Sequence, residues 1–402
     1  MPFNKVFIYF TCALALFPLL KLNHFSVLMM IWLVLALVCG FKNKTFSYLK
    51  KEWKTLAILS FFAWMYGLYL PFVSDFDEWG RSVVKSLPFL VFPVGFILNK
   101  ELITSKVLKI FGSLFLLTML IVNSLGWMSV FSYGFFQAWQ ENDFYHPMFR
   151  SLFAEATSLH LPYLGVLSTF AALYAVLRMF QLQKVQPLYI LATLYLMGSV
   201  YIYSARMALI CFFTGILFII WKKIPKPTLK WGLLAVIPGV LLMIFWFSPI
   251  KERYTQTVEK EWVLPHKGQQ PHEVNYRYGV WYCSIDLIKN HPLTGVGVDK
   301  VQQKLNECYS QFDYESYEDF SKVVYNTHNQ YFDQILKFGV FGLMAFCLVL
   351  FYFVPNNTLL YQIFIITVFL SFLTENLLDR QIGVVFISLF NTIFVISTKK
   401  VQ

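Results

Sequence analysis

Runs of about 17 to 20 apolar residues recur along this chain, and they constrain its fold more than any other feature does. A helix of that length crosses the apolar core of a bilayer, which is roughly 30 Å thick. The composition agrees, because hydrophobic residues make up 57% of the chain and charged residues only 14%. The sequence therefore predicts an all-α polytopic membrane protein.

We expect about twelve transmembrane helices, with the residues between them forming loops on the two sides of the membrane. The predicted spans are 6–20, 25–41, 54–73, 81–98, 105–128, 160–180, 186–203, 205–221, 229–248, 333–354, 356–374 and 380–397. We treat 1–402 as a single integral membrane domain. Its one long loop, 249–332 between spans 9 and 10, is too small for a large core of its own, so we expect this subdomain to pack on the membrane bundle.

Basic residues lie at every second boundary between span and loop. They are Lys5; Lys42, Lys44, Lys50, Lys51 and Lys54; Lys100, Lys106 and Lys109; Arg178 and Lys184; Lys222, Lys223, Lys226 and Lys230; and Lys399 and Lys400. Cytoplasmic loops of membrane proteins carry this excess, so both termini are predicted to be cytoplasmic and 249–332 to face the outer compartment. The net charge of +11 is largely this topological signal and does not indicate a nucleic-acid partner.

Two cysteines, Cys283 and Cys308, share the predicted outer loop. In an oxidising compartment they could pair, but their spacing says nothing about geometry, so a disulfide and two free thiols both stay open. The other four cysteines fall inside apolar spans, where a cysteine is usually a small buried hydrophobe; they are Cys12, Cys39, Cys211 and Cys347.

Two arginines lie at the predicted outer face. Arg206 stands at the start of the eighth span, after a hairpin that is almost without length. An arginine at that depth is costly unless it pairs or reaches the interface, so it is either a functional residue or an interfacial anchor. Arg277 opens a stretch in which apolar residues recur at helical spacing, and Asn290 with Pro292 should end that amphipathic helix.

The segment PLTGVGVD follows that helix. Its Gly295 and Gly297 permit a tight turn and a close approach of backbone N–H groups to a ligand. An ordinary turn at the end of a helix explains the two glycines as well.

His328 precedes the tenth span, for which Asn326 or Thr327 is a candidate N-cap. In the first turn of that helix the macrodipole would help to keep the imidazole neutral, which suits a general base. The alternative is an interfacial hydrogen-bonding residue. The remaining histidines lack partners at metal-ligand spacing, so we expect no metal site, and a solvated loop explains the acidic cluster at Asp313 to Asp319 better than a cation site does.

The order of these motifs is similar to that of a known family. Ser204 and Arg206 form an SxR at the outer end of a span, Arg277 opens the motif that ends in HPLTGVG, and HNQY, from His328, leads to GVFGL in the next span. This arrangement resembles the O-antigen ligase and O-antigen polymerase family of bacterial membrane glycosyltransferases. The motifs cover about 206–343, and the topology resembles that family along the whole chain.

The resemblance implies a multi-pass protein of the bacterial inner membrane that takes a glycan from undecaprenyl diphosphate at the periplasmic face, without metal or cofactor. It implies that Arg206 and Arg277 hold the diphosphate and that His328 activates the acceptor hydroxyl. Asn329 and Arg380 are expected to bind substrate together with the two glycines. Glu375 and Asp379, beside Arg380, resemble a less defined polar site of the family.

We therefore expect an inverting O-antigen ligase that joins the lipid-linked glycan to a lipid A-core acceptor. A polymerase that extends the lipid-linked glycan is the alternative, because the two enzymes share donor chemistry and differ in acceptor. A polysaccharide transporter or flippase is a third reading, which would call for broken helices and charges at mid-membrane, whereas the polar groups here gather at the outer face.

Overall fold

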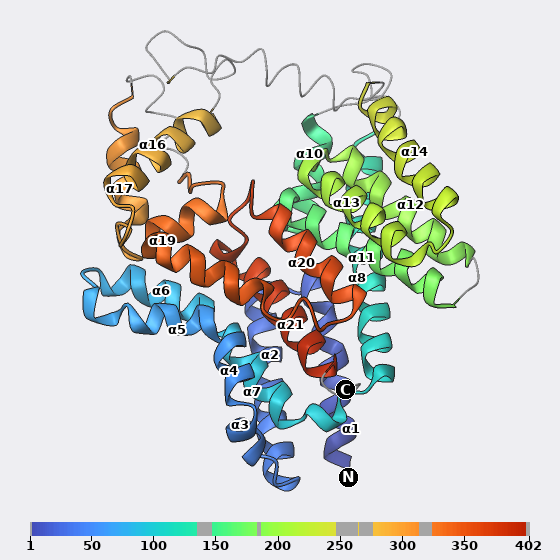
Figure 1. Ribbon diagram of the computed structural model, residues 1–402, viewed down its shortest axis with the longest axis horizontal. Helices are drawn as coiled ribbons and strands as arrows, with labels where there is room; N and C mark the ends of the chain where they lie inside the picture. The colour runs from blue at the N-terminus through green and yellow to red at the C-terminus, as the bar shows by residue number, and fades with distance from the viewer. Residues whose placement is uncertain are drawn as a thin grey trace.

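Every regular element in the described part of the chain is a helix (Figure 1). The computed structural model describes residues 2–134, 147–182, 186–246, 264, 276–312 and 324–398. The α-helical fold class expected from the apolar runs is thus confirmed over these residues. The acidic stretch 313–319 and most of 249–275 lie outside them.

The helices follow the chain in this order: α1 (Pro2–Ala13), η1 (Leu14–Leu19), α2 (Leu22–Lys42), α3 (Ser47–Lys51), α4 (Trp53–Leu59), α5 (Phe61–Leu68), η2 (Leu70–Phe72), α6 (Phe76–Ser86), α7 (Pro88–Leu98), η3 (Lys100–Leu102), α8 (Ser105–Tyr133), α10 (Pro147–Thr157), α11 (Leu161–Leu182), α12 (Pro187–Ile202), α13 (Arg206–Lys223), α14 (Pro227–Trp246), α16 (Tyr276–Asn290), α17 (Val301–Tyr309), α19 (Gln330–Phe351), α20 (Leu359–Ser371), η4 (Leu377–Asp379) and α21 (Gln381–Thr398).

Each of the expected spans coincides with a helix or with consecutive helices, but they are not all long enough to cross a bilayer unaided. Five described helices have the length and hydropathy for a crossing, and a sixth candidate, α4 with α5 and η2, is bent by 72°. The apolar helices α12, α20 and α21 are shorter. The structure therefore supports a multi-pass protein, while the number of twelve crossings stays a prediction.

Short polar side chains set where several helices begin. Asp75 accepts hydrogen bonds from two backbone N–H groups of α6, and Thr104 accepts one from Val107 in α8. Thr358 does the same for α20. These side chains satisfy N–H groups that have no partner inside the helix, which is why the chain turns helical directly after them.

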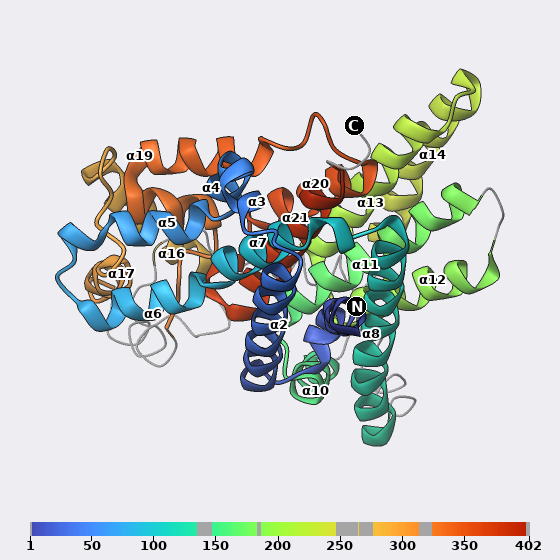
Figure 2. The same ribbon diagram turned by 90° about the horizontal axis from the view of Figure 1, so that it is seen from below.

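The core of the bundle is built from phenylalanine rings. Phe115 of α8, Phe170 of α11, Phe364 of α20 and Phe390 of α21 are each almost wholly buried and pack against one another at ring-centroid distances of 4.8 to 6.2 Å. Helix α11 is buried on nearly all sides, as its apolar sequence requires. It occupies the middle of the molecule in Figure 2.

The outer face of α8, in contrast, is apolar and exposed. Leu117, Ile121, Leu125 and Met128 follow one another at helical spacing, and each is at least 41% exposed. A continuous apolar stripe of this kind is unfavourable in water and is what a lipid-facing surface requires. Both chain termini lie in the lower part of Figure 1, whereas α16 and α17 lie at the upper end of the molecule.

Candidate active site

Helix α16 carries Arg277 in its first turn and ends at Asn290, as the sequence predicted. Val280 and Cys283 are completely buried on one face of this helix, where they pack with Leu305 of α17 and Leu336 of α19. Cys283 and Cys308 form a disulfide with a Cα–Cα distance of 5.8 Å, which settles the choice between paired and free thiols. The helix that carries Arg277 is therefore joined to α17 by a disulfide and packs on α19.

The turn before α19 shows His328 in a left-handed backbone conformation, with φ at +46°. Such a conformation is uncommon for a residue with a side chain and has to be held in place by its surroundings. Here the carboxamide oxygen of Asn326 accepts a hydrogen bond from the His328 N–H at 3.0 Å.

Two expectations about this turn were wrong. The N-cap of α19 is Asn329, whose side chain accepts hydrogen bonds from the N–H groups of Tyr331 and Phe332, and not Asn326 or Thr327. His328 consequently precedes the helix and does not lie in its first turn. Asn329 is buried and its amide also donates to the Leu373 carbonyl, so in this structure its side chain organises the backbone.

The connection between α20 and α21 lies directly against this turn. Thr327 and Asn376 exchange side-chain hydrogen bonds at 2.9 to 3.1 Å, and the carboxamide oxygen of Gln330 accepts one from the Leu378 N–H. The Tyr163 hydroxyl of α11 donates to the Asn376 carbonyl at 2.7 Å. These buried bonds place residues 372–380 beside His328, although almost 50 positions in sequence separate the two segments.

Glu375 is the residue of this connection that joins the predicted site together. One of its carboxylate oxygens lies 3.4 Å from the Arg277 guanidinium, and the other lies 4.0 Å from Nδ1 of His328. Its side chain is only 8% exposed. Burial raises the pKa of Glu375 to about 7, and the opposing effects of Arg277 and Arg380 are too small to cancel that rise.

The imidazole of His328 is held in its neutral form. Burial lowers the pKa of His328 to about 4, and the positive charge of Arg277 acts in the same direction. Its Nδ1 is buried and has no hydrogen-bond partner among the residues that the structure describes. A neutral imidazole with the Glu375 carboxyl group 4.0 Å from one of its nitrogens can act as a general base.

A second histidine and two more arginines surround this centre. Arg380 lies over the ring of Tyr163, 5.9 Å from its centroid, and Arg150 of α10 donates to the carbonyls of Tyr203 and Ser204. His160 reaches solvent with part of its ring, yet desolvation and then Arg380, Arg150 and Arg277 lower its pKa to about 4. One small region thus contains four basic side chains from different helices and loops, namely His160, Arg150, Arg277 and Arg380.

Sequence reasoning did not single out His160 or Arg150. His160 directly precedes an apolar run at a boundary predicted to be outer, and this position was the available signal. Arg150 lies in α10, a helix that the apolar runs of the sequence did not predict.

Arg206 is the first residue of α13, as expected, and the hairpin that precedes it is three residues long. Its helix packs on α20, because Cys211 contacts the carbonyl of Thr367 and the hydroxyl of Ser371. Arg206 therefore lies at the same end of the bundle as residues 372–380. Among the contacts seen between described residues, none joins Arg206 to Arg277 or His328.

Gly295 and Gly297 have positive φ values of +70° and +103°, which explains why glycine occupies both positions. The N–H groups of Val296 and Gly297 both donate to the Leu336 carbonyl of α19, and a Cβ on Gly295 would meet that same carbonyl at 2.4 Å. The turn is thus pressed against α19. These glycines position α16, and their N–H groups are already used within the protein.

A buried ion network lies beneath the turn. Lys337 of α19 contacts Asp333 at 2.7 Å and Asp379 at 3.2 Å, and Asn326 also donates to Asp379. Burial by itself would raise the pKa of Asp379, but Lys337 and Lys85 lower it below its ordinary value. Asp379, one of the acidic residues noted in the sequence, is therefore a support of the His328 turn.

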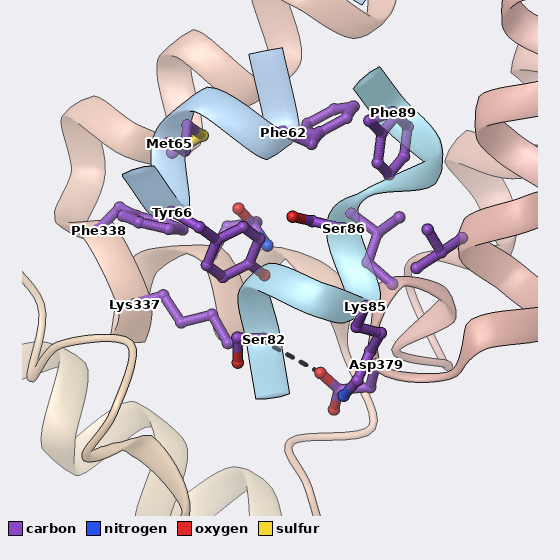
Figure 3. Close-up of a pocket in the computed structure, with 13 residues that line it drawn as sticks. Phe62, Met65, Tyr66, Ser82, Lys85, Ser86, Phe89, Lys337, Phe338 and Asp379 are labelled. Carbon is purple, nitrogen blue, oxygen red and sulfur yellow. Dashed lines mark hydrogen bonds and ion pairs between the residues drawn. The ribbon is translucent and has the colours of Figure 1, made fainter. Parts of the chain in front are cut away.

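Figure 3 shows Lys85, Tyr66 and Lys337 around a cavity of about 20 Å³ next to Asp379. That volume is about the size needed for one water molecule. A sugar or a diphosphate does not fit there.

Comparison with known families assigns the region that carries most of these residues. A family model described as O-Antigen ligase matches residues 190–347, which include Arg206, Arg277 and His328. Glu375, Asp379 and Arg380 follow the matched segment and reach the site only through the fold. No curated protein matches the chain. Through residues 190–347, the chain is similar to the O-antigen ligase family, and the resemblance noted in the sequence is confirmed over that segment.

Proposed function

We propose that this protein is an O-antigen ligase: it transfers O-antigen or a related glycan from undecaprenyl diphosphate to a lipid A-core acceptor. The observation that carries the proposal is the cluster in which Glu375 lies between Arg277 and His328, inside and beside the segment that matches the ligase family. A membrane glycosyltransferase that uses a lipid diphosphate needs stabilising cations for the leaving group and a base for the acceptor. This cluster offers both.

Arg277 is suited to the donor diphosphate. Its side chain is 44% exposed and its described ion-pair partner, Glu375, lies at a relaxed 3.4 Å, so an incoming phosphate can compete for the guanidinium. A planar guanidinium binds two phosphate oxygens at once and stabilises the charge that develops on the leaving group. We assign Arg277 the leading role at the diphosphate, with Arg206 and Arg380 contributing from the same end of the bundle.

His328 is suited to the acceptor hydroxyl. In the proposed step the acceptor O–H bond breaks and its proton passes to the imidazole, while the oxygen forms a bond to the anomeric carbon. The bond from that carbon to the diphosphate breaks, and its electron pair leaves with the phosphate. Attack from the side opposite the diphosphate inverts the anomeric centre.

Binding of the donor would also prepare the base. Arg277 lowers the pKa of both His328 and Glu375 in the free protein. A diphosphate on Arg277 offsets that positive charge, so the pKa of His328 rises from about 4 toward the range in which a base accepts protons efficiently. The site would thus become competent for proton transfer when the donor is present.

The location that we propose is the bacterial inner membrane, with both termini cytoplasmic and the site on the periplasmic side. The disulfide between Cys283 and Cys308 supports this, because disulfides form and persist in oxidising compartments. The alternating lysine-rich boundaries support the same orientation. Both lipid-linked substrates would then be confined to one surface, which reduces the orientational search between them.

His328→Ala in purified protein with lipid-linked donor and acceptor tests the catalytic part. Transfer should fall by about 10²- to 10⁴-fold while donor binding is retained, because the side chain acts on the acceptor. His291→Ala, at an exposed position just after α16, is the matched control and should remain active. The wild type should also work in excess chelator. Full activity of His328→Ala would remove this residue as the base.

Deletion of the gene, followed by gel analysis of lipopolysaccharide, separates ligase from polymerase. A ligase deletion leaves lipid-linked polymer that is not attached to the core. Single-repeat caps on the core would instead assign the polymerase reaction to this site, and the donor half of the proposal would still stand.

A further inference from the structure

A large apolar cavity lies between α8, α11, α20 and α21, away from the candidate active site. Its volume is about 610 Å³, which is within the usual size of ligand sites, roughly 300 to 1,000 Å³. Phe115, Phe170 and Phe390 form part of its wall, and all three are nearly completely buried. An interior of this kind accepts hydrocarbon and excludes charged molecules.

The mouth of the cavity is basic. Lys109 of α8, Arg178 of α11 and Lys223 of α13 line it, and no aspartate or glutamate is present among its described lining residues. Arg178 donates from Nη1 to Gln181 at 2.6 Å, yet its Nε is buried and has no partner in the described part of the chain. A buried guanidinium N–H without an acceptor is costly, so this geometry favours an anionic ligand at the mouth.

The position of the mouth identifies the side of the membrane. His160, beside the active site, and Arg178 are 18 residues apart along the α11 segment, which corresponds to about 27 Å of helix. The apolar core of a bilayer is ~30 Å thick. The mouth therefore lies at the membrane boundary opposite the active site, where Lys106, Lys222 and Lys226 also gather.

We propose that this cavity binds an anionic phospholipid of the leaflet opposite the active site, with one acyl chain among the phenylalanines and the phosphate at Arg178, Lys109 and Lys223. The charge at the mouth selects the headgroup, and the apolar interior requires a hydrocarbon chain to accompany it. Free phosphate matches only the mouth, and a neutral lipid matches only the interior. The bound lipid would fill the centre of the bundle between α8 and α20.

Native mass spectrometry of the full chain released from nanodiscs of phosphatidylethanolamine and phosphatidylglycerol tests this proposal. The wild type should retain phosphatidylglycerol in preference to phosphatidylethanolamine. The double variant Arg178→Gln with Lys223→Gln should lower that preference by about tenfold or more, because charge-assisted hydrogen bonds to the phosphate are lost. The double variant Lys106→Gln with Lys222→Gln, which makes the same charge change at residues outside the lining, should retain it.

A second measurement keeps the test valid if the variants fold poorly. Phosphatidylglycerol should raise the melting temperature of the detergent-purified wild type, as a ligand that binds only the folded state does, and inorganic phosphate alone should not. Equal retention of the two lipids by the wild type would overturn the proposal, as would equal losses in both double variants. Displacement of the phospholipid by a polyprenyl phosphate would assign the cavity to the donor lipid and overturn it too.

Discussion

At the scale of single residues, Glu375 is the group that lies between Arg277 and His328 in the candidate site. Its buried carboxyl has a pKa of about 7 and contacts Arg277 and His328 from opposite oxygens. Once Glu375 is ionised, its carboxylate pairs with Arg277. When a phosphate binds Arg277, the carboxylate can orient the imidazole of His328 instead. Each of these three side chains therefore has a distinct expected response to substitution.

Arg277→Lys should leave the protein in the membrane but remove most of the transfer activity. A lysine keeps the positive charge, yet it is a point charge and cannot make two parallel hydrogen bonds to a diphosphate. Transfer from lipid-linked donor by the purified variant measures this. Arg81→Lys, an exposed arginine that pairs with Glu78 on α6, is the control. Near-normal transfer by Arg277→Lys would show that the role of Arg277 is only electrostatic or structural.

Glu375→Gln should change how stability depends on pH. The folded pKa of about 7 lies above the ordinary value of 4.5, so the stabilising contribution of the neutral carboxyl is complete below pH 4.5 and is lost as the pH rises through 7. The glutamine stays neutral, so its stability relative to the wild type should rise between pH 4.5 and 7 and then level off. Thermal unfolding in detergent across this range is the measurement.

Glu307→Gln is the control for that experiment. The exposed Glu307 has its pKa lowered, chiefly by a hydrogen bond from Lys304, so any change in its relative stability belongs below pH 4.5. A flat difference between Glu375→Gln and the wild type from pH 4.5 to 7 would show that the pKa of Glu375 is not raised.

At the scale of elements, the turn 291–300 holds α16 in place through contacts at both of its ends. Gly339 breaks the helical geometry of α19, and the N–H of Val340 is free to donate to the Pro292 carbonyl. At the other end Asp299 accepts hydrogen bonds from the N–H groups of Ser74 and Asp75 and from the Ser74 hydroxyl. Although burial opposes ionisation, these bonds lower the pKa of Asp299 to about 2.

Asp299→Ala should destabilise this region by ~1–3 kcal/mol, because Ser74 and Asp75 lose the charged acceptor of their hydrogen bonds. Transfer activity should fall as well, since α16 carries Arg277 and is attached through this turn. Chemical denaturation and a transfer assay on the same preparation measure both effects. Asp286→Ala on the exposed face of α16 should change neither. Unaltered stability in Asp299→Ala would mean that the glycine contacts with α19 suffice to hold the turn.

At the scale of the whole molecule, the helices separate two ends of different character. Arg277, His328 and Glu375 gather at one end. The basic mouth around Arg178 lies near the other end of α11, about 27 Å from His160. A bilayer would lie between them, with the apolar stripe of α8 facing lipid. The proposed reaction and the proposed lipid site would thus belong to opposite leaflets.

Single cysteines introduced near Lys223 and near Gln269 should react with a membrane-impermeant reagent from opposite sides of the membrane. Lys223 belongs to a lysine-rich boundary, which is typical of the cytoplasmic side. Gln269 belongs to the loop 249–332, which also contains the disulfide between Cys283 and Cys308. Labelling in intact cells and in inverted vesicles gives the answer. Reaction of both positions from one side would contradict the orientation and, with it, a periplasmic site.

The sequence by itself determined the all-α fold class, the apolar helices and the helix that carries Arg277. This was possible because apolar length, helical spacing and lysine bias are local properties, which one segment carries without reference to any other. The helix from Tyr276 to Asn290 and the start of α13 at Arg206 were confirmed for the same reason.

Only the tertiary structure decided which polar groups meet. Glu375 reaches Arg277 and His328 because the turn before α19 binds the connection between α20 and α21 through buried side-chain hydrogen bonds. The disulfide, the N-cap at Asn329 and the burial that sets the pKa values of His328 and Glu375 likewise depend on packing between distant segments. Such contacts are properties of a pair of segments, and neither member reveals them alone.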